Sequence, residues 1–136
     1  MISHRGRFAE AAEALVGTPF RFRGRDLRTG LDCVGLVEAA LCAIGRPAPP
    51  LTGYAMRQAG STPQLGAASA AGFEPAEGAI EPGDLLLARP GPAQVHLLVA
   101  ARCGGFVHAH AGLGRVVLAP PPCTWPIERR WRLAAH

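Results

Sequence analysis

The stretch Gly30–Gly45, GLDCVGLVEAALCAIG, decides how the chain folds. Asp32 has the short polar side chain preferred at a helix N-cap, an apolar run follows it, and Gly45 and Pro47 supply a stop signal. The spacing predicts a helix of about three turns that begins at Cys33. Unsatisfied N–H groups and the positive end of the helix dipole favour a thiolate over a thiol at this first position.

The face of the predicted helix that carries Cys33 is apolar. At about 100° per residue, Val37, Ala40 and Ile44 fall within about 40° of Cys33, and Cys42 falls on the opposite side. Only Cys33 therefore points at whatever the rest of the chain builds. Most buried cysteines are small core residues, so the helix alone favours packing over chemistry.

The composition limits the class of protein. The chain has 136 residues, of which 49% are apolar, and this suits a single domain over residues 1–136. Its net charge is +4, and all 14 basic residues are arginine. Such mild basicity allows weak attraction to anionic polymers, cell wall or nucleic acid, but it identifies neither.

The cysteine spacing and the N-terminal segment argue against disulfides, a metal site and a signal peptide. The four cysteines form no CxxC pair and no regular spacing, so we expect free thiols, no metal site and no cofactor. Glu10 and Glu13 interrupt the apolar run of residues 1–16, which argues against a signal peptide. No apolar segment is long enough to span a membrane. We expect synthesis in the cytoplasm, with any export by another route.

The segments before and after the Cys33 helix have their own patterns. Apolar residues at helical spacing predict a first helix over residues 8–16. In Pro19–Arg25, aromatic residues alternate with arginines, which predicts a short extended piece with one face buried. We expect its arginines to be a solvated face and not a nucleic-acid site. A proline-rich connection over 46–52, a short helix over 65–71 and a loop over 73–82 follow.

From Gly83 onward the pattern becomes that of β-strands. The predicted strands span 84–89, 94–101, 105–111, 115–119 and 127–133. Asp84 follows Pro82-Gly83 and is interpreted as a turn residue. Helices come first and an antiparallel meander second, which predicts an α+β fold with the N-terminal helices packed on a C-terminal sheet.

Three histidines lie on two adjacent predicted strands, His96 on one and His108 and His110 on the next. The Cys33 helix has only this sheet to cover with its apolar face, so the thiol should lie over the sheet. A cysteine, a histidine base and a third, orienting group are what nucleophilic acyl chemistry needs. A loop over 102–104 would set His96 opposite His110, and a loop one residue later leaves His108 diagonally near, so the spacing leaves the third group open.

Six segments occur in a recognisable order over nearly the whole chain. They are Gly17–Phe20, Gly24, Asp32–Val37, Pro82–Leu86, His96–Ala100 and Phe106–Ala109. In order and spacing they resemble the NlpC-type cysteine peptidases of bacterial cell-wall metabolism. The chain is most similar to the short phage-tail and gene-transfer-agent branch, through a GR step before the cysteine, a PGDLLL strand, and Trp125 and Trp131 near the end.

This resemblance implies a papain-like α+β fold and hydrolysis of peptide bonds in peptidoglycan stems, typically next to D-glutamate. By motif, Cys33 matches the nucleophile, His96 the general base and His108, in preference to His110, the orienting residue. It also suggests a particle that carries the protein to the periplasm, with phage-tail or gene-transfer-agent proteins as partners.

Three positions next to the motif are candidates for substrate binding: Phe20, Asp32 and Val34. The family often has tyrosine where this chain has Phe20 and serine where it has Val34, which puts the usual substrate preference in question. Asp32 is first of all interpreted as the helix cap.

The mechanism expected from these residues begins with a Cys33 thiolate and a His96 imidazolium. The sulfur attacks an amide carbonyl, the backbone N–H of Cys33 helps to stabilise the oxyanion, His96 protonates the leaving amine and water hydrolyses the acyl-enzyme. Two alternatives use the same fold. One is a cysteine acyltransferase, and the other is a phage-tail or gene-transfer-agent assembly component with a vestigial site.

Overall fold

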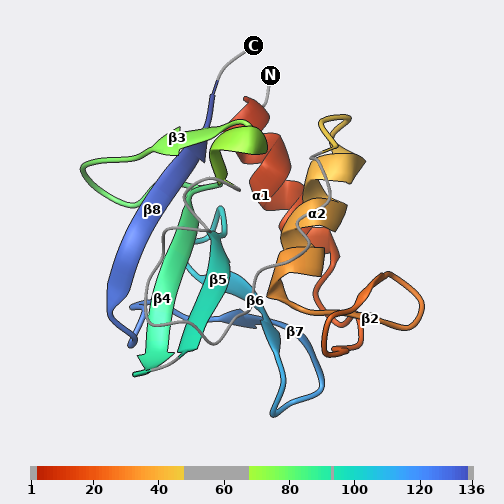
Figure 1. Cartoon of the computed structure of the whole chain (residues 1–136). Coiled ribbons are helices and arrows are strands. Elements are labelled where there is room, and N and C mark those ends of the chain that lie inside the picture. The colour runs from red at the N-terminus through yellow and green to blue at the C-terminus, as the bar shows by residue number, and fades with distance from the viewer. Residues whose placement is uncertain (1–2, 48–67, 93, 135–136) are drawn as a thin grey trace.

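The computed structural model describes residues 3–47, 68–92 and 94–134 (Figure 1). Its helices are α1 (His4–Ala14) and α2 (Cys33–Ala43). Its strands are β1 (Arg25–Asp26), β2 (Gly30–Leu31), β3 (Phe73–Pro75), β4 (Leu85–Gly91), β5 (Gln94–Ala100), β6 (Phe106–His110), β7 (Arg115–Ala119) and β8 (Ile127–Leu133). The helix and the strands predicted around Cys33 and after Gly83 are confirmed to within a few residues.

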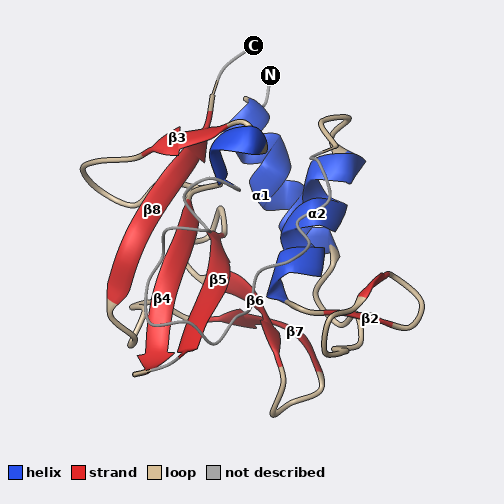
Figure 2. Ribbon diagram, viewed as in Figure 1, coloured by secondary structure: helices blue, strands red, loops and turns tan. Residues whose placement is uncertain are grey.

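Six strands form one antiparallel sheet in the order β3-β8-β4-β5-β6-β7, and α1 and α2 lie together on one side of it (Figure 2). The predicted α+β fold is confirmed. The meander holds for β4 to β7, but β8 crosses back to pair with the other edge of β4. This crossing makes β4 a central strand, which suits its Leu85-Leu86-Leu87 run because side chains on both faces of it are buried.

The core is divided by the sheet into two clusters of buried apolar residues. The larger cluster lies between the sheet and the helices, and it contains Phe8 of α1, Cys33 of α2 and Leu97 of β5. The smaller one is built on the other face from Leu86, Ala88, Leu98, Ala100 and Phe106. Alternate residues of β5 therefore face opposite clusters, as the two-residue period of a strand requires.

The two ends of the chain's described part are tied together. The α1 start and the β8 end lie at the same edge of the molecule (Figure 1), where the Nε of Arg5 donates to the carbonyl of Leu133 at 3.3 Å. Ser3 caps α1 by accepting from the N–H of Gly6. Arg102, in the turn between β5 and β6, forms ion pairs with Glu13 at 2.9 Å and with Glu10 at 3.1 Å.

Some sequence expectations were wrong or fall outside the described residues. Residues 73–75, expected in a loop, form β3 because Phe73 is buried against the main core and the sheet has a free edge at β8. Phe22 is 71% exposed, since the turn at Gly24 and the left-handed Arg23 end the extended piece after Phe20. The connection over 46–52 lies largely outside the described ranges. Of the helix expected over 65–71, residues 68–71 are described, and 68–70 are helical. No helix in the described ranges is both long and apolar enough to cross a membrane.

Candidate active site

The start of α2 is fixed as its sequence predicts. Asp32 is the N-cap, and its Oδ1 accepts from the backbone N–H of Gly35 at 2.8 Å. Cys33 is the first helical residue and is only 3% exposed. Val37 and Ala40 are buried beside it, whereas Cys42 is exposed, so the predicted division of the helix into two faces is confirmed.

The Cys33 sulfur lies against the backbone of β5, where this strand separates from β6. The last pairs in the β5–β6 ladder are Val99↔Val107 and Ala100↔Phe106. The N–H of Ala101 donates to the carbonyl of Gly105, on the β6 side of β5. Because every second N–H of a strand points to the same side, the N–H of Leu97 also points toward β6, at a position beyond the last pair of the ladder. This N–H instead faces the Cys33 sulfur and acts to lower the pKa of the thiol. The thiol thus lies on the helix side of the sheet, next to the residue that follows His96.

Two of the three candidate histidines are directly hydrogen-bonded. Nε2 of His96 lies 3.0 Å from Nδ1 of His108, and the rings meet edge to face with centroids 5.1 Å apart. Extending the β5–β6 register would set His96 opposite His110, yet the ring of His110 accepts from the N–H of Leu113 at 3.0 Å. The structure therefore joins His96 to His108 and leaves Nδ1 of His96 as the nitrogen available to a thiol.

The His96–His108 pair and Cys33 belong to different faces of the sheet. His96 pairs with Ala88, a member of the smaller cluster, whereas Cys33 belongs to the helix-side cluster. Among the described residues, the structure has no hydrogen bond between the Cys33 sulfur and either ring. A contact between the sulfur and the His96 ring would have to pass through the gap between β5 and β6, beyond the last paired residues of the ladder.

Trp125 covers the histidine pair. Its ring meets that of His96 at a centroid distance of 5.6 Å and that of His108 at 5.7 Å, both edge to face. It is carried by the loop between β7 and β8, and it also packs on the smaller core cluster. The sequence does not indicate a role for Trp125 at the site, because nothing in the spacing shows that β8 crosses back and brings this loop over β5.

The thiol is neutral in this structure, contrary to the expected thiolate. Burial raises the pKa of Cys33 to about 12, and the neighbouring Asp32 carboxylate acts in the same direction. The N–H of Leu97, the charge of Arg25 and the N–H of Cys33 itself lower this pKa but do not offset the burial. Desolvation therefore outweighs the helix start, whose effect on exposed residues is modest.

His96 and His108 are neutral as well. Burial lowers the pKa of His96 to about 3, and repulsion from positive charge on His108 and His110 acts in the same direction. The pKa of His108 is lowered to about 4, again mainly by burial. The expected thiolate–imidazolium pair is consequently not the resting state of the site. A neutral His96 has a free lone pair and can accept a proton from the thiol during attack.

The three predicted substrate-binding positions lie close to α2 but differ in exposure. Val34 is buried in the main core, and Phe20 packs at its margin while its N–H donates to Gly114. Asp32 is buried and engaged as the cap and in an ion pair with Arg25 at 2.7 Å. Their roles toward a substrate stay predictions.

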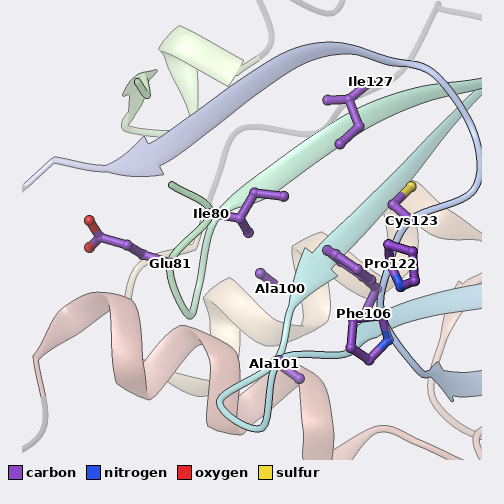
Figure 3. Close-up of a pocket in the computed structure, with 10 residues that line it drawn as sticks. Ile80, Glu81, Ala100, Ala101, Phe106, Pro122, Cys123 and Ile127 are labelled. Atoms are coloured by element: carbon purple, nitrogen blue, oxygen red, sulfur yellow. The ribbon is translucent and has the colours of Figure 1, made fainter. Parts of the chain in front are cut away.

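A separate apolar cavity of about 360 Å³ opens on the sheet face away from the helices (Figure 3). Phe106, Cys123 and Ile127 are among the residues that line it. Cys33, His96 and His108 do not, so this cavity is distinct from the site described above.

Comparisons with known proteins support the fold. No family model matches the sequence, and none of the curated proteins is significantly similar to it. Among solved structures, NlpC1 from Trichomonas vaginalis is similar over 96% of this chain and 44% of its own, with a TM-score of 0.71 and 20% identity. The NlpC/p60 domain of the peptidoglycan hydrolase SagA is similar over 96% of this chain and 98% of its own, with a TM-score of 0.63 and 22% identity.

A third similar structure is the peptidoglycan hydrolase RipB from Mycobacterium tuberculosis, with a TM-score of 0.61 and 20% identity over 97% of this chain and 65% of its own. This chain thus spans less than half of NlpC1 and just under two thirds of RipB, but nearly all of the SagA domain. The chain has the NlpC/p60 fold, as the sequence predicts.

Proposed function

We propose that this protein is a cysteine peptidase that hydrolyses peptide bonds in peptidoglycan stem peptides, with Cys33 as nucleophile, His96 as general base and His108 as orienting residue. One observation carries the proposal. The only cysteine at a helix start contacts the backbone of Leu97, and the preceding residue, His96, has its far nitrogen held by His108. The fold shared with the peptidoglycan hydrolases RipB and SagA supports the substrate class.

Because the Cys33 thiol and the His96 imidazole are both neutral, we propose general-base catalysis. In the proposed first step, the Cys33 sulfur attacks the amide carbonyl carbon while its proton passes to Nδ1 of His96. For Nδ1 to accept this proton, Nε2 of His96 must carry the N–H, which donates to Nδ1 of His108 and keeps the ring in place. The N–H of Cys33 stabilises the oxyanion, His96 returns the proton to the leaving amine, and water then hydrolyses the thioester with His96 again as base.

Purified muropeptides provide the test. We expect the wild-type protein to release a new amine from stem peptides, and Cys33→Ala to abolish this release. Cys42→Ala is the matched control, because Cys42 lies on the same helix but is exposed on its far side. Equal digestion by Cys33→Ala and the wild type would make Cys33 a core residue only. Acyl transfer to an added amine, with no hydrolysis, would establish the acyltransferase alternative instead.

A finer proposal concerns how the protein reaches its substrate. From the GR step, the PGDLLL strand and Trp125 and Trp131, we propose that a phage-tail or gene-transfer-agent particle carries it to the periplasm. Purified particles probed with an antibody against this chain should contain it. Its recovery only from the cytoplasmic fraction of particle-producing cells would rule out this route.

A further inference from the structure

We infer that Arg25 is a positioning residue for Cys33: it holds the Asp32 cap in place and balances the negative charge of that cap beside the thiol. This inference rests on the proposed role of Cys33 as the nucleophile. Nη1 of Arg25 lies 2.7 Å from Oδ1 of Asp32, the same oxygen that accepts from the N–H of Gly35. Arg25 thus binds the same oxygen that caps the first turn of α2.

The same guanidinium ties the β1–β2 hairpin to the helix. Nη1 also donates to the carbonyl of Gly24 at 3.0 Å, and Nε lies 3.4 Å from Oε1 of Glu38, six residues after Asp32 in α2. The fork of arginine allows these contacts on two sides at once, which a lysine ammonium on its flexible stem does not reproduce. The Arg25 side chain is 35% exposed, so solvent screens part of its charge.

Backbone packing shows that this hairpin is built for close approach to the start of α2. The carbonyl of Gly24 accepts from the N–H of Asp32 at 3.2 Å. A Cβ added to Gly35 would stand 2.2 Å from that carbonyl oxygen, so only glycine fits there. The hairpin, the cap and the nucleophile therefore form one rigid unit, in which Arg25 supplies the side-chain contacts.

The charges of Asp32 and Arg25 also act on the thiol of Cys33. The carboxylate of Asp32 is adjacent to Cys33 and raises the pKa of the thiol, whereas Arg25 lowers it. Because Asp32 caps the helix, its negative charge lies next to the nucleophile, where a neighbouring cation can offset it. Arg25, in contact with the carboxylate, provides that offset.

Alkylation of Cys33 by iodoacetamide tests the inference without a substrate. The rate is followed on the Cys33 peptide by mass spectrometry, because well below the thiol pKa it is proportional to the thiolate fraction. In the full chain, we expect Arg25→Met to react about tenfold more slowly than the wild type at the same pH, which corresponds to about one unit of thiol pKa. Arg25→Lys keeps the charge and should stay within about threefold of the wild type.

A charge cycle separates the electrostatic role from a structural one. Asp32→Asn keeps an oxygen for the Gly35 N–H and should react faster than the wild type, and adding Arg25→Met to it should bring the rate close to that of the wild type. If Arg25 only braces the hairpin, Arg25→Met will loosen the site and expose the thiol, so its alkylation would equal or exceed the wild-type rate. That result would overturn the inference. Loss of the proposed peptidase activity would not, because alkylation is read independently of hydrolysis.

Discussion

His96, the proposed general base, is held by contacts with several parts of the molecule. One ring nitrogen is hydrogen-bonded to His108, the ring meets that of Trp125 edge to face, and the next residue's N–H contacts the Cys33 sulfur. Because each contact comes from a different element, a single substitution at each partner tests a separate part of the site.

Replacing His108 should show which histidine orients His96. We expect His108→Ala to lower kcat/KM on muropeptides by about a hundredfold or more, since His96 loses the contact that fixes its ring and tautomer. His110→Ala is the matched control and should cost less than about threefold, because the His110 ring is engaged with the Leu113 N–H. A His110→Ala defect as large as that of His108→Ala would contradict this assignment.

Trp125 should control the titration of the histidine pair. Trp125→Ala removes the ring that shields His96 and His108, so water reaches both imidazoles and their pKa values should rise toward the ordinary value. NMR titration of the histidine ring protons measures this directly. Trp125→Phe keeps an aromatic cover and should leave both values near those of the wild type. Unchanged titration in Trp125→Ala would mean that other groups provide the burial.

At the scale of elements, β8 connects the sheet, the histidine pair and the buried carboxylate of Asp84. It pairs with β4 and β3, brings the Trp125 loop over β5, and carries Arg130 and Arg132 to the carboxylate of Asp84. Asp84 is fully buried, with Arg130 at 3.3 Å and Arg132 at 2.7 Å. Besides being the turn residue that the sequence predicts, through its bond from the Glu81 N–H, it anchors β8 to the start of β4.

Neutralising Asp84 should therefore destabilise the fold. We expect Asp84→Asn to cost about 3–5 kcal/mol in the free energy of unfolding, because two arginines lose a buried partner. Urea unfolding followed by circular dichroism measures the change. Glu128→Gln, which weakens the more exposed pair of Glu128 with Arg89, should cost less than about 1 kcal/mol. Similar losses in the two variants would show that the Asp84 cluster is not the anchor.

At the scale of the whole molecule, the buried neutral histidines link stability to pH. Their pKa values are lowered from 6.5 in the folded chain, so the unfolded chain binds more protons as the pH falls below 6.5. Stability should therefore be highest above about pH 6.5 and fall between pH 7 and pH 5, by at most about 2 kcal/mol for each of His96 and His108. The loss stops growing only below the lowered pKa values.

Urea unfolding at several pH values between 7 and 5 measures this slope. The window lies above the range in which most carboxylates titrate, so the histidines dominate it. The double variant His96→Gln/His108→Gln should remove most of the pH dependence. A wild-type stability that is flat from pH 7 to pH 5 would contradict the burial of neutral imidazoles.

Local sequence signals determine the start of α2, the strands from Gly83 onward and the α+β fold, because a cap, an apolar period and turn residues act over a few positions. They also select Cys33 and bring His96 and His108 into consideration. Only the tertiary structure decides what depends on distant segments: β8 crosses back, Trp125 covers the histidines, and Arg25 reaches Asp32. The neutral state of the thiol belongs to the same group. The sequence shows the helix start that favours a thiolate, but the desolvation that overrides it arises only when the helix packs on the sheet and buries the thiol.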